Sequence, residues 1–357
     1  MSTTFTYPTN VTLDKVVQEY VIDTSGFLGL QIMPVETSMT QKVQWDEMDN
    51  ERGMTAPHVL GTEPRIDLRP GSKLREYTPI PFKETDLVKE DELLNSRQLG
   101  TLGGAINLNQ MMAMLAKARM DKTRIRQEWT IWQALRGRMT INENGVYVDE
   151  QFPIQIYTPL VPWNDFANAR PIKDFNAIKL LYRGTGATTR GAKAYVNSTT
   201  LNWLLENQNQ NDLKGFQNSN YLNLTFDIDQ LNAILSKRAG LTLVEYDDGC
   251  YDAAGNYQTF IADGDVHIVG VRPFGEKIGG WMSTPTLHRI VGGQAAPGYF
   301  EILEVNGVPS GIGANSVTIS QLGAGKNPKM ELTGGVYGGP FMRFGRSVIR
   351  MKTGPVV

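Results

Sequence analysis

Apolar and small side chains recur at helical spacing over one long segment, residues 104–138. They are Leu108, Met111, Leu115, Ala118, Ile125, Trp129 and Trp132, with Lys122 as the one interruption. This alternation of three and four residues places them on one face of a helix, and the segment has no proline or glycine between Ala105 and Arg136. At 1.5 Å per residue the helix would be about 50 Å long. A helix of that length usually spans something or is covered by neighbours.

The segments before this helix have a different pattern. Residues 1–35 begin with a polar stretch and continue with apolar side chains at helical spacing, until Gly26 and Gly29 break the pattern. Residues 36–85 show no sustained apolar period and are dense in charge, glycine and proline, yet they hold more aliphatic and aromatic residues than disordered chains usually do. We therefore expect a projecting two-stranded arm there. Residues 86–99 are polar and begin with Asp86, and we expect them to be helical.

The segments after the long helix alternate between strands and helices. Gly137 is expected to end the helix, and residues 142–145 are expected to form the turn of a hairpin. Pro171 stands where a helix would begin, and residues 171–272 read as a compact α/β domain. Ser198 is the expected N-cap of the next helix. Residues 273–357 are rich in glycine, with strand candidates at 299–305, 316–319 and 341–351.

Two further strands are expected to form a hairpin. Residues 257–261 and 266–271 are strand candidates, and Asp263-Gly264-Asp265 lies between them as a turn. The trailing strands near the end of the chain are expected to return to a sheet that begins earlier.

Composition narrows the classes of function. The 357 residues are 41% hydrophobic and 20% charged, with a formal net charge of −2, so strong non-specific binding of nucleic acid is not favoured. The single cysteine, Cys250, excludes an intrachain disulfide and a cysteine-based zinc site and favours a cytoplasmic origin. We find no signal peptide and no apolar run long enough to span a membrane.

Glycine-rich and histidine motifs give no support for a cofactor or a metal. The stretch 184–191 follows a helix and precedes a strand, the reverse of a dinucleotide fingerprint, and 323–326 lacks two residues of a phosphate-binding loop. His58, His267 and His288 are isolated in the sequence, so structural roles are the default.

Acidic pairs are the remaining candidates for chemistry. Asp247 with Asp248, and Asp263 with Asp265, fall in expected turns, where aspartate commonly bonds to the local backbone. No nucleophile elbow and no Cys/His constellation accompanies them. We therefore expect no catalytic residue, no cofactor and no metal.

Three motifs follow one another along the chain. They are, in order, Arg126-Gln-Glu128-Trp-Thr-Ile-Trp132-Gln-Ala-Leu135-Arg-Gly137, Trp163-Asn-Asp165 with Pro171, and residues 257–271 followed by Arg272-Pro273. Their order resembles that in the major capsid proteins of tailed bacteriophages, in the branch called the major capsid protein E family. Each motif alone is a loose match to the family, and the order of the motifs over residues 10–350 is more specific to it.

The resemblance implies an α+β capsid fold and names for its parts. Residues 1–35 would be an N-terminal arm, 36–85 an extended loop, 86–170 a peripheral domain with spine helix 104–138, 171–272 an axial domain, and 273–357 a Gly-rich insertion with returning C-terminal strands. The extended loop would contact other subunits through Trp45, His58, Leu60, Arg65, Leu68, Lys73, Arg75 and Tyr77. The spine helix would be anchored by Leu115, Ile125, Trp129 and Trp132.

The resemblance also implies a function without catalysis. Identical subunits would form hexamers and pentamers of an icosahedral shell that encloses double-stranded DNA without sequence recognition. A separate scaffolding protein, a portal and a decoration protein are further expected partners, with no membrane involved. The protein would be made in the cytoplasm of a bacterial host and would reside in the virion.

Three alternatives stay open at this stage. An encapsulin-like compartment shell would carry a groove for cargo peptides. A tail-tube or other virion protein would form rings or tubes. An α/β enzyme would need a pocket with convergent groups of shifted pKa. The basic side chains of the long helix, Arg119, Lys122, Arg124 and Arg126, are a nucleic-acid patch, a solvated face or partners of acidic neighbours.

Overall fold

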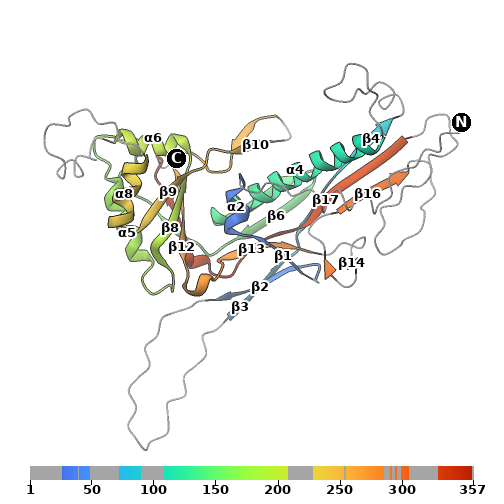
Figure 1. The fold of residues 1–357 in the computed structure, drawn as a ribbon. Coiled ribbons are helices and arrows are strands. Elements are labelled where there is room, and N and C mark those ends of the chain that lie inside the picture. The colour runs from blue at the N-terminus through green and yellow to red at the C-terminus, as the bar shows by residue number, and fades with distance from the viewer. Residues whose placement is uncertain are drawn as a thin grey trace, which may run out of the picture. The chain divides into compact units, whose positions relative to one another are not determined.

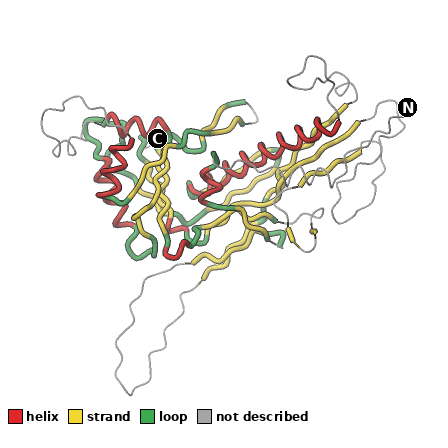
Figure 2. Tube along the Cα trace, in the orientation of Figure 1, coloured by secondary structure: helices red, strands yellow, loops and turns green. Residues whose placement is uncertain are grey.

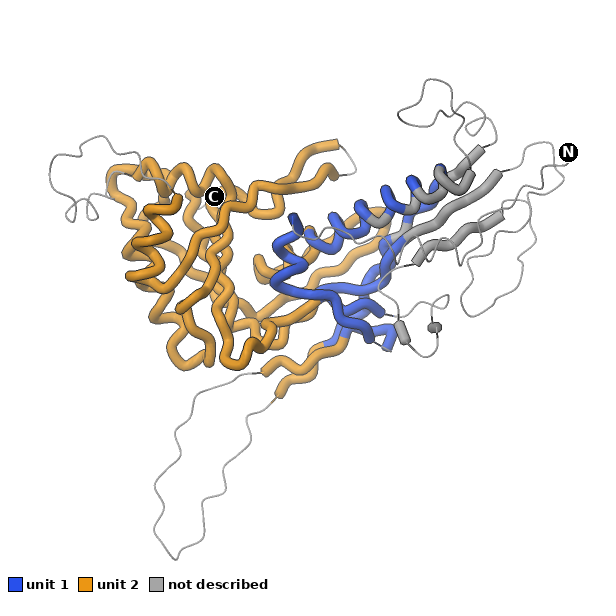
Figure 3. Tube along the Cα trace, in the orientation of Figure 1, with its two compact units in different colours: residues 1–43, 76–128, 281–340 blue, residues 44–75, 129–280, 341–357 orange. Residues whose placement is uncertain are grey.

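The fold is seen in a computed structural model that divides into two compact units (Figure 3). Unit 1 consists of residues 1–43, 76–128 and 281–340, and unit 2 of residues 44–75, 129–280 and 341–357. The structure describes residues 26–38, 40–48, 72–89, 108–207, 228–252, 255–284, 290–291, 294–295, 299–304 and 329–355. Each unit is described by itself.

The sheet of unit 1 is built around one long strand, β17 (Lys329–Met342). Its strand order is β1 (Val35–Thr37), β13 (Gly279–Ser283), β17 and β16 (Tyr299–Glu304), and β4 (Ile80–Lys89) also pairs with β17. The β1–β13 pair is parallel, whereas β4 and β16 run antiparallel to β17. The register of β4 runs from Ile80 opposite Gly338 to Lys89 opposite Lys329. A short separate pair joins β14 (Ile290–Val291) to β15 (Gln294–Ala295).

The helix expected over residues 86–99 is wrong for its first part. Residues 86–89 are the end of β4, and residues 90–99 lie outside the described residues. The polar composition suggested a helix, but ten consecutive pairings with β17 decide the conformation of this segment because tertiary pairing overrides weak local propensity.

The long helix, α4, spans Leu108–Leu135 (Figure 1). Its 28 residues correspond to about 42 Å, and residues 104–107 of the expected helix lie outside the described residues. The expected end is confirmed, because Gly137 has a φ of 93° and its N–H bonds to the carbonyl of Ala134. A left-handed glycine just past the last turn is a common way to end a helix. The chain then enters the expected hairpin, β5 (Arg138–Glu143) and β6 (Val146–Gln151), with Asn144 and Gly145 in the turn.

The sheet of unit 2 brings together strands that are far apart in the sequence. Its order is β7 (Gln155–Tyr157), β18 (Val348–Lys352), β12 (Asp265–Val271), β8 (Thr188–Val196) and β9 (Leu241–Glu245). The outer pairs β7–β18 and β8–β9 are parallel and the inner pairs are antiparallel. The strand near the end of the chain therefore returns to an earlier sheet, as expected.

Helices cover one face of this sheet. They are α5 (Pro171–Leu181), α6 (Ser198–Glu206) and α8 (Ile228–Arg238), and α5 and α8 lie side by side (Figure 2). Phe175 and Ile178 of α5 pack with Ala192 and Ala194 of β8 in one buried core. Pro171 begins α5 as expected, and the glycine-rich stretch 184–191 connects α5 to β8 and extends into that strand, which begins at Thr188. None of the described helices is long and apolar enough to cross a membrane.

Three expectations about local structure in unit 2 are wrong. Residues 257–261 do not pair with 266–271: β11 (Tyr257–Thr259) pairs with β10 (Gly249–Tyr251), and β12 joins the five-stranded sheet. Asn197 rather than Ser198 caps α6, because its side-chain oxygen accepts the N–H of Thr200. Residues 341–351 are two strands rather than one, because the 3-10 turn η3 (Gly345–Ser347) separates β17 from β18.

The remaining described elements are short. The pair β2 (Val43–Met48) and β3 (Ser72–Tyr77) forms a two-stranded sheet. The 3-10 turn η2 (Pro273–Gly275) follows β12, and α2 (Leu28–Ile32) precedes β1. Gly29 was expected to break the helical pattern but lies inside α2.

Candidate functional site

The last turns of α4 place one large aromatic side chain on the sheet of unit 2. Trp132 is fully buried, and its ring makes edge contacts with Tyr195 of β8 and His267 of β12, with centroids 5.6 Å apart in both cases. Its ring also lies 5.4 Å from that of Tyr246. Burial of an aromatic side chain of this size contributes strongly to folding, so this contact fixes the end of the helix against the sheet.

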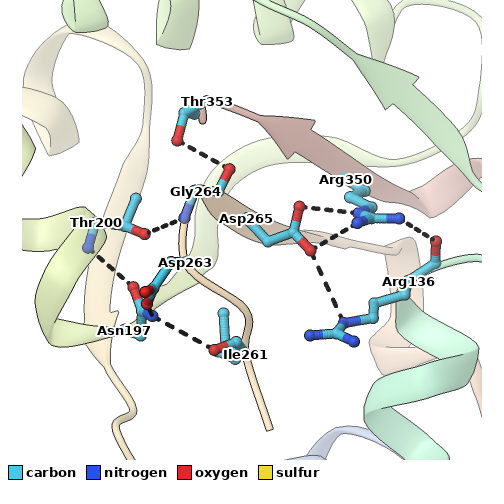
Figure 4. Close-up of polar contacts among 9 residues, drawn as sticks. All are labelled: Arg136, Asn197, Thr200, Ile261, Asp263, Gly264, Asp265, Arg350 and Thr353. Carbon is cyan, nitrogen blue, oxygen red and sulfur yellow. Dashed lines mark hydrogen bonds and ion pairs between the residues drawn. The ribbon is translucent and has the colours of Figure 1, made fainter. Parts of the chain in front are cut away.

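A buried ionic cluster lies beside this contact (Figure 4). The carboxylate of Asp265 accepts two hydrogen bonds from Arg350, from Nε at 3.1 Å and from Nη2 at 2.7 Å. The Nε atom of Arg136, just past α4, lies 3.8 Å from the same carboxylate, and Nη1 of Arg350 donates to the carbonyl oxygen of Arg136. The cluster thus joins the end of α4 to two neighbouring strands.

The loop before β12 is held by a second set of hydrogen bonds (Figure 4). The amide of Asn197 donates to Asp263, and the hydroxyl of Thr200 accepts the N–H of Gly264 at 2.9 Å. The carbonyl of Gly264 accepts from the backbone N–H and the hydroxyl of Thr353. Gly264 has a φ of 77°, and a Cβ at that position would lie 2.6 Å from the backbone of Gly354, so this turn requires glycine.

These contacts account for the acidic pairs that the sequence offered as candidates for chemistry. Asp265 was expected in a turn but begins β12, where its carboxylate is buried in the ionic cluster with Arg350 of the neighbouring strand β18. Asp247 bonds to Ser198, and Asp248 to the backbone N–H of Gly249. Among the described residues no group of three His, Cys, Asp or Glu side chains is placed to hold a metal ion.

His267 is the one histidine that the structure describes. Burial lowers its pKa to about 4, partly offset by the nearby carboxylate of Asp265 and reinforced by the charges of Arg136 and Arg350. The side chain is therefore neutral at pH 7 and serves as packing for Trp132. His58 and His288 lie outside the described residues.

In unit 1, α4 carries a fully buried carboxylate at Glu128. Its oxygens accept the N–H of Gly29 at 2.6 Å and that of Leu30 at 2.9 Å. Hydrogen bonds to an ionised acceptor are among the strong ones. A Cβ on Gly29 would lie 2.8 Å from Oε2 of Glu128, which explains why glycine stands inside the short helix α2.

The basic side chains of α4 are engaged with acidic or aromatic neighbours. Arg119 pairs with Asp86 and Glu84 of β4, and Lys122 also lies within ion-pair distance of Glu84. Arg126 places its guanidinium 4.7 Å from the ring centre of Phe82, a cation–π contact. Arg124 donates to Gln127. Of the readings that the sequence left open for this helix, these contacts favour pairing with acidic neighbours for Arg119 and Lys122.

The residues expected in the extended loop fall into two groups. Trp45 is buried and stacks on Phe152 within unit 2, and Tyr77 is buried within unit 1, where its hydroxyl donates to the carbonyl of Pro340. Lys73 is exposed, and Arg75 pairs with Glu47 across β2 and β3 at 2.8 Å. His58, Leu60, Arg65 and Leu68 lie outside the described residues.

The four expected anchors of the long helix differ in burial. Trp132 has no exposed surface, whereas Leu115, Ile125 and Trp129 are half-buried. Sequence reasoning missed Arg350, the centre of the buried ionic cluster. A single arginine within the apolar run of β18, Val348–Lys352, was the available signal, because a charge in a buried strand requires a partner.

Comparisons with known proteins place this architecture. The chain matches the family model for phage major capsid protein E over residues 9–279. A phage-related protein from Bordetella bronchiseptica RB50 has a TM-score of 0.54 at 10% identity, with 99% of this chain and 100% of that chain covered. A protein described as the capsid protein of an Escherichia coli CFT073 prophage has a TM-score of 0.55 at 13% identity, with 96% and 98% covered.

At such identities these two structures show a shared fold and nothing more. A search of curated proteins finds no match. The family match covers most of the sequence, including α4, its carboxylate Glu128 and the ordered motifs that carried the resemblance. The chain belongs to the phage major capsid protein E family.

Proposed function

We propose that this chain assembles with identical copies into hexamers and pentamers of a closed icosahedral shell that encloses double-stranded DNA. The observation that carries the proposal is the family match over residues 9–279. Individual contacts below about 1,200 Å² are weak, but many such contacts per subunit give a stable lattice whose single contacts stay reversible. The protein would act by association, with no reaction of its own.

We assign the contacts between subunits chiefly to the part of the extended loop that lies between β2 and β3. Trp45 and Tyr77 are buried in their own chain and Arg75 is paired with Glu47, so these residues support the base of the loop. The proposed contacts between subunits are therefore made by the exposed Lys73 and by His58, Leu60, Arg65 and Leu68, which lie outside the described residues.

The remaining partners follow from the proposed shell. A separate scaffolding protein would guide closure, a portal would occupy one vertex, and a decoration protein could bind the outer surface. The packaged DNA would contact the inner surface without sequence recognition, and the near-neutral net charge of −2 is compatible with a wall that does not trap its contents. Synthesis would take place in the cytoplasm of the bacterial host, and the mature protein would reside in the virion.

The test is electron microscopy of the purified full-length chain and of a variant that lacks residues 50–72. We expect closed shells from the full-length chain, and soluble subunits or capsomers that fail to close from the variant. A control in which residues 50–72 are kept in shuffled order separates loop length from specific contact, and circular dichroism verifies folding. Tubes or dispersed monomers from the full-length chain would refute the shell, and normal shells from the variant would refute the role of the loop.

A further inference from the structure

The outer face of α5 in unit 2 is basic. Arg170, just before the helix, and Lys173, Lys179 and Arg183 are all exposed, and none forms an ion pair with another residue that the structure describes. The one acidic residue of this segment, Asp174, points inward, where its carboxylate accepts hydrogen bonds from Trp163 and Tyr157. Among the described residues, the four cations therefore have no carboxylate within ion-pair distance.

An apolar side chain lies among these charges. Leu180 is 54% exposed on the same outer face, while Phe175 and Ile178 occupy the buried face of α5. An apolar centre with a charged surround is typical of protein interfaces. We refer to Arg170, Lys173, Lys179, Leu180 and Arg183 as the basic face.

The hairpin β10–β11 of the same unit has the opposite character. No lysine or arginine occurs between Arg238 and Arg272, whereas Asp247 and Asp248 are exposed at the base of the hairpin. Asp252 accepts the backbone N–H of Asn256 and shapes the far end. Every charged side chain of the hairpin is therefore acidic.

Two tyrosines give the acidic hairpin an apolar centre of its own. Tyr251 and Tyr257 are 73% and 51% exposed, and their rings meet edge to face with centroids 5.3 Å apart. The phenol of Tyr257 also lies over Gly249, where a Cβ would approach its Oη within 2.9 Å. A pre-ordered aromatic pair loses little side-chain freedom on binding, so this surface is suited to contact.

The hairpin extends from unit 2 on the side away from α5 (Figure 1). The acidic hairpin of one chain therefore cannot cover the basic face of the same chain. A contact between two different patches on identical copies is head-to-tail, and a head-to-tail contact generates rings when the rotation closes.

From these observations we propose that the β10–β11 hairpin of one subunit docks on the basic face of α5 of the next. Tyr251 and Tyr257 would pack around Leu180, and the aspartates would oppose the lysines and arginines at the rim. Complementary charge of this kind sets the register and raises the rate of association. This inference rests on the proposed assembly and specifies one contact within a ring of subunits.

The native cysteine offers a direct test, because Cys250 lies in β10 and is the only cysteine in the chain. In N176C a second cysteine stands on the exposed side of α5. Mild oxidation of the full-length variant should give a ladder of disulfide-linked oligomers on a non-reducing gel. The matched control is K193C on β8, an exposed position that points away from α5, and it should give no ladder.

Charge reversal supplies the second arm of the test. In the N176C background, reversing Lys173, Lys179 and Arg183 to glutamate should slow formation of the ladder by at least about tenfold, because it removes the attraction. Adding D247K and D248K to this charge-reversed variant should restore much of the rate of ladder formation, because the two surfaces then carry opposite charges again. Circular dichroism establishes that each variant is folded.

Three other outcomes would overturn the inference. Oligomers by sedimentation without a ladder would refute this contact and leave the proposed shell intact. Dispersed monomers of the unmodified chain would refute the shell and the contact together. Unchanged oligomers that carry less co-purified DNA after reversal of the basic face would assign that face to nucleic acid instead.

Discussion

Two Arg–Asp pairs in unit 2 have the same geometry and different surroundings, and this difference predicts very different energies. In each pair the Nε and Nη2 atoms of arginine donate to the two oxygens of one carboxylate. The distances are 3.1 and 2.7 Å for Arg350 with Asp265, and 2.7 and 2.6 Å for Arg138 with Asp149. The side chain of Asp265 is 6% exposed, whereas that of Arg138 is 59% exposed.

The perturbation is D265A. It leaves the guanidinium groups of Arg350 and Arg136 partly buried without their counter-charge, and loss of one partner of a buried ion pair costs about 3–5 kcal/mol. D265N keeps the shape and some of the hydrogen bonding, so its cost should be about 1.5–3 kcal/mol, the range for a hydrogen bond to a charged group. D149A breaks the shorter pair, but solvent screens that pair and its loss should have only a small effect.

The assay is urea unfolding of unassembled subunits, followed by tryptophan fluorescence at several salt concentrations. The midpoint of D265A should fall well below that of the unmodified chain, with D265N between them and D149A close to the unmodified chain. If D149A is destabilised as much as D265A, burial does not decide the energy of these pairs and the reasoning fails. A cost of D265A below about 1 kcal/mol, the value of an exposed pair, would refute it equally.

Three further predictions concern single side chains in the two units. W132A should lower the free energy of unfolding by about 3–5 kcal/mol, and W129A by clearly less because Trp129 is only half-buried; equal losses in urea titrations would contradict this. The folded pKa of His267 is about 4, below its ordinary value near 6.5, so the unfolded chain binds the extra proton first. The free energy of unfolding should therefore keep its full value above about pH 6.5 and fall by about 3 kcal/mol as the pH drops to 4. Thermal melts of H267F should lack the pH dependence that protonation of His267 causes. G29A should lower the melting temperature, because its methyl group would displace the carboxylate of Glu128 from two N–H donors, and an unchanged melting temperature would exclude that clash.

The parts of the fold that could be predicted from sequence carry strong local signals. The end of α4 at Gly137, the turn at Asn144 and Gly145, and the start of α5 at Pro171 each follow from the backbone preferences of one or two residues. The long apolar period of α4 is a signal of the same local kind. Such features depend little on distant segments, so the sequence is sufficient for them.

The parts that could not be predicted depend on distant partners. Which strand pairs with β12 is decided by β8 and β18, more than seventy residues away on either side, and its almost continuous burial gives no alternating pattern to read. The partner of Asp265 is likewise Arg350, eighty-five residues along the chain. Asp265 was expected in a turn because nothing nearby in the sequence reveals the arginine.

Glycine was also misleading in the last part of the chain. Residues 329–340 were not among the strand candidates of this glycine-rich region, yet they form most of the long strand β17. A Cβ on Gly338 would lie 2.3 Å from the carbonyl of Met282, and one on Gly339 would lie 2.0 Å from the hydroxyl of Tyr77. These glycines allow close packing within a strand, a role that becomes visible only with the neighbours in place.

The position of β18 in its sheet has a consequence for biosynthesis. This strand, residues 348–352, lies between β7 and β12, so a ribosome must translate nearly all of the sequence before the gap between them is filled. Until then β12 lacks its partner on one edge and Asp265 lacks Arg350. A chain that is still being translated therefore lacks the strand that completes this sheet and supplies the counter-charge of Asp265.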